Sequence, residues 1–252
     1  MLQSLFDGTL EPHKQSETIS PVDEFLAVIS HELRIPISAI LGWAELLDSQ
    51  QIDHTGFAMA VEVIKRNALV QVRLIDELTD YSSITANKLA LTIRVVSLSQ
   101  IIKTAAEALA PTARKKQIHV EAQFGLSPTE MDGDPTRLLQ VFSNLFSNAI
   151  KFTPSGGSVI ATLGSSGDYH TVTVSDTGDG ISAEFLPFVF DRYRQADRTA
   201  SGRGGLGLGL TIARHIVELH GGTIKAESAG KGMGSDFIVQ LPRRAGPQAG
   251  RS

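Results

Sequence analysis

Two long stretches of apolar residues at helical spacing constrain the fold more than any other feature of this sequence. Within residues 21–49 and again within residues 57–87, apolar side chains recur every three or four positions. At about 100° per residue they share one face of a helix. The two stripes comprise Val22, Leu26, Ile29, Leu33, Ile37, Ile40, Ala44 and Leu47, then Val61, Ile64, Ala68, Val72, Ile75 and Leu78. With a turn at residues 50–56, they predict two antiparallel helices that form a hairpin.

The first helix has a clear start signal. Ser20 is suited to accept a hydrogen bond from an unpaired backbone N–H, and Pro21 fits the first helical position. Asp23 and Glu24 favour the positive end of the helix dipole. Pro36 lacks an N–H and predicts a kink within the helix.

A two-helix hairpin cannot enclose its own apolar stripe, and Trp43, Leu41 and Leu46 add further apolar surface beside it. Pairing two copies into a four-helix bundle would cover this surface. We therefore expect a homodimer held by residues 20–90. The alternative is that the hairpin packs against the rest of its own chain.

His31 lies in the string FLAVISHELRIP, on the side of the first helix opposite the centre of its apolar stripe. Taken alone, such a residue is more often an ordinary surface histidine. A solvated imidazole beside Glu32 is also a candidate nucleophile. The choice between these readings depends on what the second half of the chain contains.

From residue 90 onward the pattern alternates between strand and helix, which predicts an α+β domain with helices layered on one face of a mixed sheet. Asp134 and Pro135 are a typical cap and first residue for one of these helices. A GSSGD turn separates the two central strands. We expect strands at 90–96, 118–124, 129–133, 158–163, 169–175, 222–228 and 235–241, and helices at 97–116, 135–152 and 206–219.

Composition excludes several functional classes. The net charge of -4 leaves no basic stripe for nucleic acid, and the absence of cysteine rules out disulfides and thiolate chemistry. No stretch of about 18 apolar residues is present, so we expect no membrane contact within this chain. The absence of cysteine is compatible with the cytoplasm, and the opening residues lack the charged-then-apolar order of a signal peptide. We therefore expect a cytoplasmic chain, alone or as the cytoplasmic part of a larger, membrane-anchored or hybrid protein. We expect a linker at 1–20, the hairpin at 21–89, the α+β domain at 90–243 and a disordered tail at 244–252.

The string DPTRLLQVFSNLFSNAIKFTP places two amides and an ammonium on one helix. Asn144 and Asn148 are one helical turn apart on the same face, and Lys151 follows three residues later. Amide oxygens suit Mg²⁺ without adding charge, and a lysine ammonium suits a phosphate. Taken alone, helical asparagines are more often surface or capping residues.

The string DTGDGI directly follows a predicted strand. The carboxylate of Asp176 could accept a hydrogen bond from the exocyclic amine of adenine. Gly178 and Gly180 would let the backbone approach a base without a Cβ clash. By itself, this string is only a turn.

The string GGLGLGL, residues 204–210, precedes a predicted helix. Gly205, Gly207 and Gly209 would leave backbone N–H groups and the positive helix end open to an anion. The string is neither the Rossmann fingerprint nor a P-loop, because no βαβ unit surrounds it and no GxxxxGK[ST] occurs.

In this order and at these separations, the strings resemble the histidine kinases of two-component signalling. HELRIP is similar to their phosphoacceptor box, NLFSNAIKF to the asparagine box, and DTGDGI and GGLGLGL to the two glycine boxes, with FVFDRYRQ between them. The resemblance covers residues from about 20 to 242. It implies a dimeric helical hairpin followed by an α/β sandwich of the Hsp90 and gyrase type that binds ATP.

The resemblance also implies roles for individual residues. Asn148 would coordinate Mg²⁺, Asn144 and Lys151 would hold the triphosphate, and Asp176 would read adenine. Residues 191–205 would form a mobile lid. Arginines in or beside that lid that could reach a phosphate are Arg192, Arg194, Arg198 and Arg203.

By the same resemblance, ATP would phosphorylate His31, with Glu32 accepting the proton of the ring nitrogen that does not attack. The phosphoryl group would then pass to an aspartate of a response regulator. Ile35 stands where many members have a threonine or asparagine that positions a water, so we expect weak phosphatase activity.

A silent ATP-binding scaffold and an ATPase are the rival interpretations, but an ATPase would need an acid where Asn144 lies. The hairpin argues against a serine-directed kinase.

Overall fold

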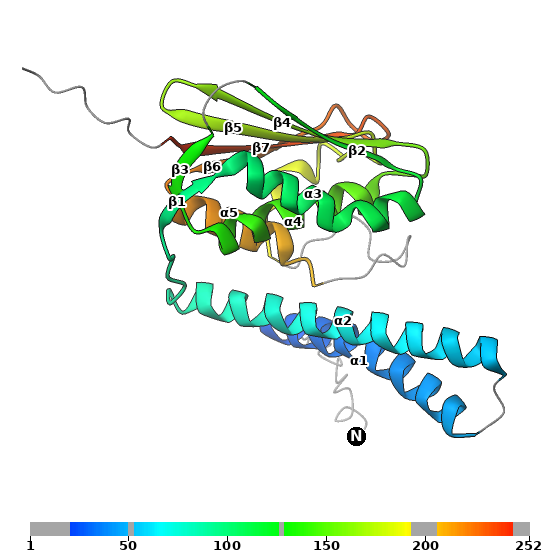
Figure 1. The fold of residues 1–252 in the computed structure, drawn as a ribbon. Coiled ribbons are helices and arrows are strands. Elements are labelled where there is room, and N and C mark those ends of the chain that lie inside the picture. Colours follow the sequence, from blue (N-terminus) through cyan, green and yellow to red (C-terminus); the bar gives the residue numbers. More distant parts are fainter. Residues whose placement is uncertain (1–20, 50–52, 126–128, 193–205, 244–252) are drawn as a thin grey trace, which may run out of the picture.

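The computed structural model describes residues 21–49, 53–125, 129–192 and 206–243, with side chains of the first helix from Leu26 onward. Helices α1 (Pro21–Asp48) and α2 (His54–Thr85) form the predicted hairpin, which lies along one side of the molecule (Figure 1). Helix α2 starts earlier than expected because the Asp53 side chain accepts a 2.7 Å hydrogen bond from the Gly56 N–H. The predicted turn was therefore too long.

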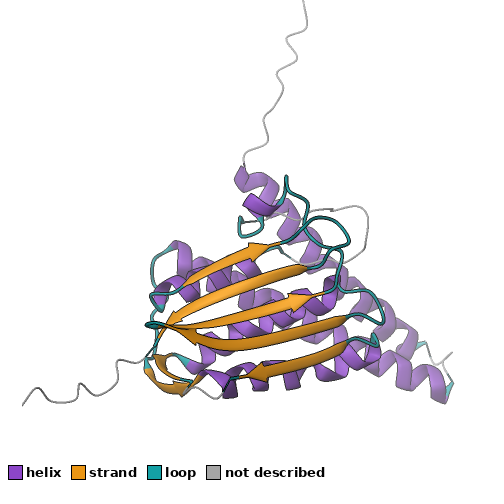
Figure 2. Cartoon of the chain, turned by 90° about the horizontal axis from the view of Figure 1, so that it is seen from above, coloured by secondary structure: helices purple, strands orange, loops and turns teal. Residues whose placement is uncertain are grey.

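The second unit, which we call the sandwich, contains a five-stranded sheet and three main helices on one of its faces (Figures 1 and 2). The helices are α3 (Leu98–Lys115), α4 (Pro135–Phe152) and α5 (Gly209–Leu219). The sheet has the order β2-β4-β5-β7-β6, formed by β2 (His119–Phe124), β4 (Ser158–Ser166), β5 (Tyr169–Asp176), β7 (Ser235–Pro242) and β6 (Thr223–Glu227).

The sheet is mixed, as predicted. Strands β2 and β4 run parallel, and the other neighbouring pairs are antiparallel. The core lies between sheet and helices, where Phe142 and Phe146 of α4 are fully buried against strand residues such as Val172 and Val239. The expected fold class, a helical hairpin followed by an α/β sandwich, is confirmed.

Two predicted strand boundaries were wrong for tertiary reasons, and one short helix was missed. The strand expected at 90–96 is only β1 (Arg94–Ser97), because its antiparallel partner β3 (Glu130–Gly133) is four residues long. The GSSGD turn is shorter than predicted, because Gly164 to Ser166 continue the pairing of β4 with β5. A short 3-10 helix, η1 (Leu186–Phe188), was not predicted.

The hairpin is only partly covered by the sandwich. Leu74 and Ile84 of α2 are buried and belong to the same apolar cluster as the sandwich core. Other apolar side chains stay open, with Leu41 56%, Leu69 62% and Val72 55% exposed. Packing against the chain's own remainder therefore covers one part of the hairpin and leaves another uncovered. Among the described helices, none has the length and apolarity needed to cross a bilayer.

Candidate functional site

The candidate phosphoacceptor is exposed. The His31 side chain on α1 is 71% accessible, and its Nδ1 lies 3.5 Å from Oε1 of Glu32, which is only 18% accessible. The carboxylate therefore faces Nδ1 and not the other ring nitrogen, Nε2. The imidazole points away from apolar surroundings, as predicted. Ile35, one helical turn further on, is also exposed.

Helix α4, which holds the candidate phosphate and Mg²⁺ ligands, is fixed at its start by Asp134. The Asp134 carboxylate accepts hydrogen bonds from the backbone N–H groups of Thr136, Arg137 and Thr92. Burial raises the pKa of Asp134, but these hydrogen bonds outweigh burial and hold that pKa below its ordinary value. The N–H of Asp134 also donates to His220 Nε2 at 3.0 Å, which ties the start of α4 to the end of α5.

The three candidate side chains on α4 differ in their surroundings. Asn144 is buried, and its Nδ2 donates a 3.0 Å hydrogen bond to the Gly209 carbonyl at the start of α5. Asn148 and Lys151 are half-buried, and the Lys151 ammonium lies 5.0 Å from the centre of the Phe152 ring. In this structure Asn144 therefore links two helices, while Asn148 and Lys151 remain accessible.

The candidate adenine-binding residue Asp176 is buried at the end of β5. Its Oδ1 accepts a 2.8 Å hydrogen bond from Gly178 N–H, and its Oδ2 accepts a 2.6 Å hydrogen bond from Ser235 Oγ. Burial raises the pKa of Asp176, an effect that these hydrogen bonds partly oppose. Sequence reasoning missed Ser235, because its place at the start of the last strand looked like ordinary hairpin sequence.

The loop after Asp176 requires glycine at two positions. A Cβ on Gly178 would come within 2.7 Å of both Asp176 Oδ1 and the Phe152 carbonyl oxygen. Gly180 has a φ of +66°, and a Cβ there would overlap the Gly230 carbonyl oxygen. Both glycines therefore permit close backbone contacts around the loop that follows Asp176.

In the string GGLGLGL, the described leucines are buried in the core, and a glycine between them allows the backbone to turn. Leu206 and Leu208 are fully buried, while Gly207 adopts a φ of +67° between them. Helix α5 begins at Gly209, later than predicted, and its N-cap residue Leu208 makes no side-chain hydrogen bond to the first N–H groups. Gly205, the arginines at 194, 198 and 203, and nearly all of the predicted lid lie outside the described residues.

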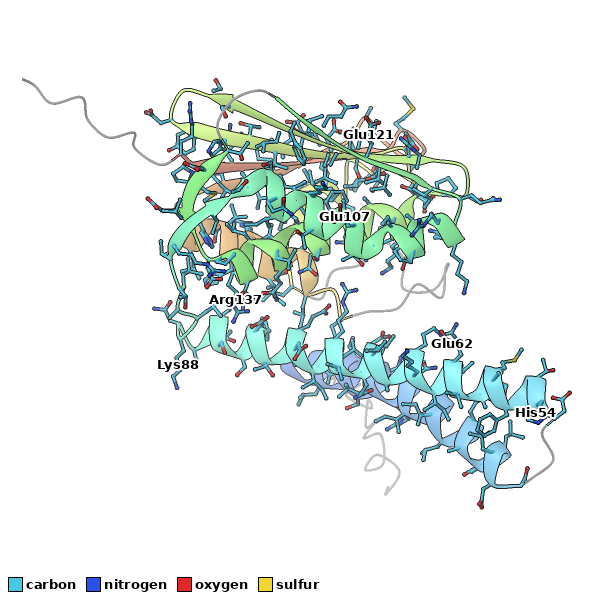
Figure 3. The ribbon with its side chains drawn as sticks, viewed as in Figure 1. His54, Glu62, Lys88, Glu107, Glu121 and Arg137 are labelled. Carbon is cyan, nitrogen blue, oxygen red and sulfur yellow. The ribbon has the colours of Figure 1, made fainter. Side chains whose placement is uncertain are left out.

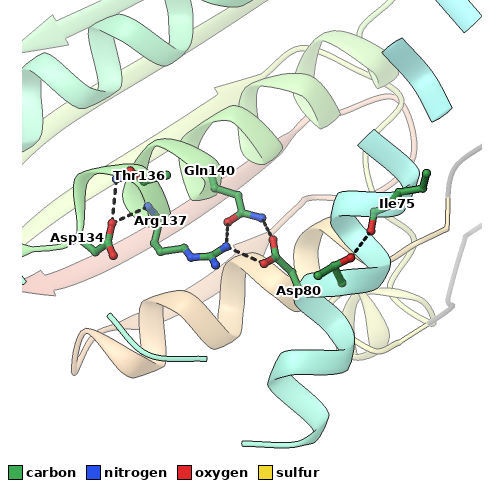
Figure 4. A network of polar contacts seen from close by, with 7 residues as sticks. Ile75, Asp80, Asp134, Thr136, Arg137 and Gln140 are labelled. Atoms are coloured by element: carbon green, nitrogen blue, oxygen red, sulfur yellow. Dashed lines mark hydrogen bonds and ion pairs between the residues drawn. The ribbon is translucent and has the colours of Figure 1, made fainter. Parts of the chain in front are cut away.

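Helix α2 contacts the sandwich through polar side chains that sequence reasoning did not assign. Asp80 accepts hydrogen bonds from Arg137 Nη1 at 2.7 Å and from Gln140 Nε2 at 2.5 Å (Figure 4). Arg137 lies on the side of the sandwich that faces α2 (Figure 3). Closer to the candidate ligands, Arg73 Nη1 donates to Ser147 Oγ at 3.3 Å.

Two further α2 side chains face the same region. Burial raises the pKa of Glu77, an effect opposed by the neighbouring cations Arg73 and Lys151. Arg192 donates to the Tyr81 hydroxyl at 3.2 Å and lies over its ring. The hairpin therefore reaches the same face of α4 that bears Asn148 and Lys151.

Two domain families match this chain in the order that the geometry suggests. Residues 22–87, which include His31, match the His Kinase A (phospho-acceptor) domain. Residues 133–245, which include Asn148 and Asp176, match the histidine kinase-, DNA gyrase B-, and HSP90-like ATPase family. This chain belongs to the histidine kinase family. It contains the catalytic core of a sensor histidine kinase.

Curated relatives place the chain in the same family. The sensor protein GacS of Pseudomonas syringae pv. syringae is 37% identical over 224 residues, which cover 86% of this chain and 24% of GacS. The hybrid signal transduction histidine kinase D of Dictyostelium discoideum is 35% identical, over 87% of this chain and 17% of that protein. The chain thus spans about a quarter or less of the length of these two relatives.

Solved structures share this histidine kinase fold. Full-length ShkA in complex with AMPPNP is 26% identical, with a TM-score of 0.66 over 89% of this chain and 47% of ShkA. The histidine kinase ThkA in complex with the response regulator protein TrrA has a TM-score of 0.62 over 92% of this chain and 64% of that chain. At 24% identity, the ThkA match supports the fold alone.

Proposed function

We propose that this chain transfers the γ-phosphoryl group of ATP to His31. The observation that carries the proposal is the exposed imidazole of His31, with Nδ1 facing Glu32, in one chain with an ATPase-family sandwich. A histidine that served only packing would be buried, and a histidine paired at both nitrogens could not attack. The phosphoacceptor role of His31 and the roles of the sandwich residues below are parts of this proposal.

The reaction follows from the two ring nitrogens. Neutral imidazole carries its proton on Nδ1, beside Glu32, and its lone pair on Nε2. Nε2 attacks the γ-phosphorus in line, so an N–P bond forms while the bond from that phosphorus to the bridging oxygen of the departing ADP breaks. Glu32 then accepts the Nδ1 proton, which leaves a neutral phosphorylated ring.

The surroundings of Asp176 fit an adenine amine. An ionised carboxylate offers about four lone-pair sites. The N–H of Gly178 and the O–H of Ser235 use two of these sites. A remaining site can accept the exocyclic N–H of adenine. Gly178 and Gly180 keep Cβ atoms out of the adjoining backbone contacts.

Of the three candidate residues on α4, two fit a magnesium triphosphate directly, and the third has a supporting contact. The amide oxygen of Asn148 suits Mg²⁺, and Lys151 suits a phosphate oxygen. No cluster of three or more acidic or imidazole ligands occurs among the described residues, which fits an ion held mainly by phosphates and water. When bound, Mg²⁺ offsets negative charge on the transferred group. Asn144, also on α4, supports the site by linking α4 to α5, since its Nδ2 donates a hydrogen bond to the Gly209 carbonyl.

We also propose a homodimer through the hairpin. Apolar side chains on α2 remain exposed at helical spacing, among them Phe57, Val61, Val72 and Ile75. A second copy would cover this face in a four-helix bundle. Whether His31 receives phosphate from its own sandwich or its partner's depends on the turn at residues 50–52, which lies outside the described residues. Mixing a His31→Gln chain with an Asn148→Ala chain and looking for labelled protein decides between them.

The proposed partner is a response regulator, whose aspartate takes the phosphoryl group from His31. Exposed His31 is accessible to such a domain, and the similar protein ThkA was solved in complex with one. The alkyl side chain of Ile35 cannot orient a water for the reverse hydrolysis, so phosphatase activity is expected to be weak. We place these reactions in the cytoplasm, where ATP is available.

The test is to incubate the chain with γ-labelled ATP and Mg²⁺. We expect protein-bound label that is stable to alkali and lost in acid, as for a phosphorus–nitrogen bond. Chelation of Mg²⁺ or use of α-labelled ATP should give no labelled protein. If ATP binds without any labelling, the chain is the catalytically silent scaffold instead. If label is released only as free phosphate, the chain is an ATPase.

A further inference from the structure

An ammonium group from the end of α3 binds three backbone carbonyls at the end of α4. Lys116 caps the C-terminus of α3, and its side chain crosses to α4. Its Nζ donates to the carbonyl oxygens of Ile150 at 2.6 Å, Lys151 at 3.1 Å and Thr153 at 3.0 Å. Three hydrogen bonds are the full donor capacity of an ammonium.

These bonds complete the hydrogen bonding of the α4 terminus. The last four carbonyls of an α-helix have no partner within the helix. Here the Ala149 carbonyl accepts from the N–H and O–H of Thr153, and those of Ile150 and Lys151 accept from Lys116. The remaining one, on Phe152, accepts a 3.1 Å hydrogen bond from Asp179 N–H. A positive charge at a helix C-terminus is also favoured by the helix dipole.

The hydrogen bond between Asp179 N–H and the Phe152 carbonyl connects the end of α4 to the loop at residues 177–181, which follows Asp176 and which we call the adenine loop. Asp179 lies between Gly178 and Gly180, and Gly178 is so close to the Phe152 carbonyl that a Cβ there would clash. Hydrogen bonds therefore join the backbone that carries Lys151 to the loop that follows Asp176. Lys116 binds the helix side of this junction. A shift at residues 150–153 would move both ends of the nucleotide site.

We propose that Lys116 is a positioning residue for nucleotide binding. It touches neither base nor phosphate in this assignment. Its ammonium fixes the backbone of Lys151 and Phe152, so that the phosphate-binding ammonium and the adenine loop keep their spacing. The inference rests on the proposed nucleotide site.

The test compares Lys116→Met, which keeps an unbranched side chain but removes the charge, with Lys116→Arg, which restores donors. The matched control is His170→Leu. His170 is fully buried, bonds Ser165 Oγ and the Glu130 carbonyl, and lies at the opposite end of β5 from Asp176. Both Lys116→Met and the control remove buried hydrogen bonds from the sandwich, so both are expected to lower its melting temperature.

Binding of ATP with Mg²⁺ is measured by calorimetry well below the melting temperature of the least stable variant. Lys116→Met should weaken binding on the order of tenfold, within the usual range of coupling between a binding site and a group outside it. Lys116→Arg should recover most of the affinity, and His170→Leu, a distant site, should change the affinity by less than about twofold. Amide exchange at Asp179 should accelerate in Lys116→Met alone.

Three results would overturn the role of Lys116: unchanged ATP affinity in Lys116→Met, an equal loss in His170→Leu, or unchanged exchange at Asp179. The unmodified chain separates this failure from that of the proposed function. If it does not bind ATP, the nucleotide site itself is refuted. If it binds ATP and Lys116→Met binds equally well, only the positioning role is refuted.

Discussion

The hairpin and the sandwich enclose their apolar residues to very different extents. In the sandwich, Phe142, Phe146 and Leu145 are fully buried within a single chain. In the hairpin, Leu41, Leu69 and Val72 are more than half exposed. The sandwich has two layers that cover each other, whereas the hairpin has only one layer and a partial contact with α4 and α5.

This difference matches a division of tasks. A nucleotide site needs groups held in fixed positions, and the closed core of the sandwich supplies them through α4 and β5. A phosphoacceptor needs to meet both an ATP site and a partner protein, and an exposed helix allows this. We infer that the sandwich is stable as a single copy and that the hairpin depends on a second one.

The largest expected effect is on the sandwich core. Replacing the fully buried Phe142 by alanine should lower the free energy of unfolding of the sandwich by about 3–5 kcal/mol, because it leaves a cavity. Urea denaturation should show this loss at every protein concentration. The control is Phe57→Ala in the hairpin, whose ring is 57% exposed. Its cost should be smaller and should depend on protein concentration; equal, concentration-independent costs would remove the distinction between the two regions.

The second effect concerns the proposed dimer. Val72→Glu should raise the dissociation constant of the dimer by about 100-fold or more, since it would bury an unpaired carboxylate. Light scattering across a dilution series measures this constant. Val95→Glu places the same charge on the similarly exposed surface of β1 and should leave the dimer intact. A Val72→Glu chain that still dimerises like the unmodified one would exclude this face.

A smaller effect is expected where the two regions touch. Asp80→Asn removes the charge that pairs with Arg137 and should weaken the contact between α2 and α4 by about 1–3 kcal/mol. Hydrogen exchange in α2 near residue 80 should then accelerate, with little change in the core of the sandwich. Glu62→Gln, at an exposed position of the same helix, is the control. Unchanged exchange in Asp80→Asn would mean that the apolar contacts of Leu74 and Ile84 suffice.

The smallest effect lies within the hairpin. Asp53→Ala removes the carboxylate that accepts from Gly56 N–H and should cost about 1 kcal/mol of helix stability. Thermal unfolding followed by circular dichroism should show a lower hairpin transition. Asp48→Ala, at the C-terminal end of α1, should cause no such loss, because a negative charge is unfavourable there. Equal losses from both variants would indicate that charge and not capping is being measured.

Local signals in the sequence predict some elements fully. Helix α4 begins at Pro135 and ends at Phe152 as predicted, because Asp134 is a cap that acts on its immediate neighbours. Helix α5 was predicted three residues too early. Leu206 and Leu208 continue an apolar pattern, but they are buried outside the helix around the positive φ of Gly207.

The site residues that could not be predicted from the sequence depend on contacts between distant segments. Ser235 reaches Asp176 across 59 positions of sequence, and Asp80 meets Arg137 across 57. Neither pair has a spacing that indicates contact. The candidate residues His31, Asn148 and Asp176 were identified from ordered strings, and their proposed roles await experiment.

The central claim is that His31 is the residue that ATP phosphorylates, and labelling of two histidine variants tests it most directly. His31→Gln should carry no acid-labile label while binding ATP as the unmodified chain does. His54→Gln, at an exposed histidine of the same hairpin, should be labelled normally. Label that persists in His31→Gln and disappears in another histidine variant would contradict the claim.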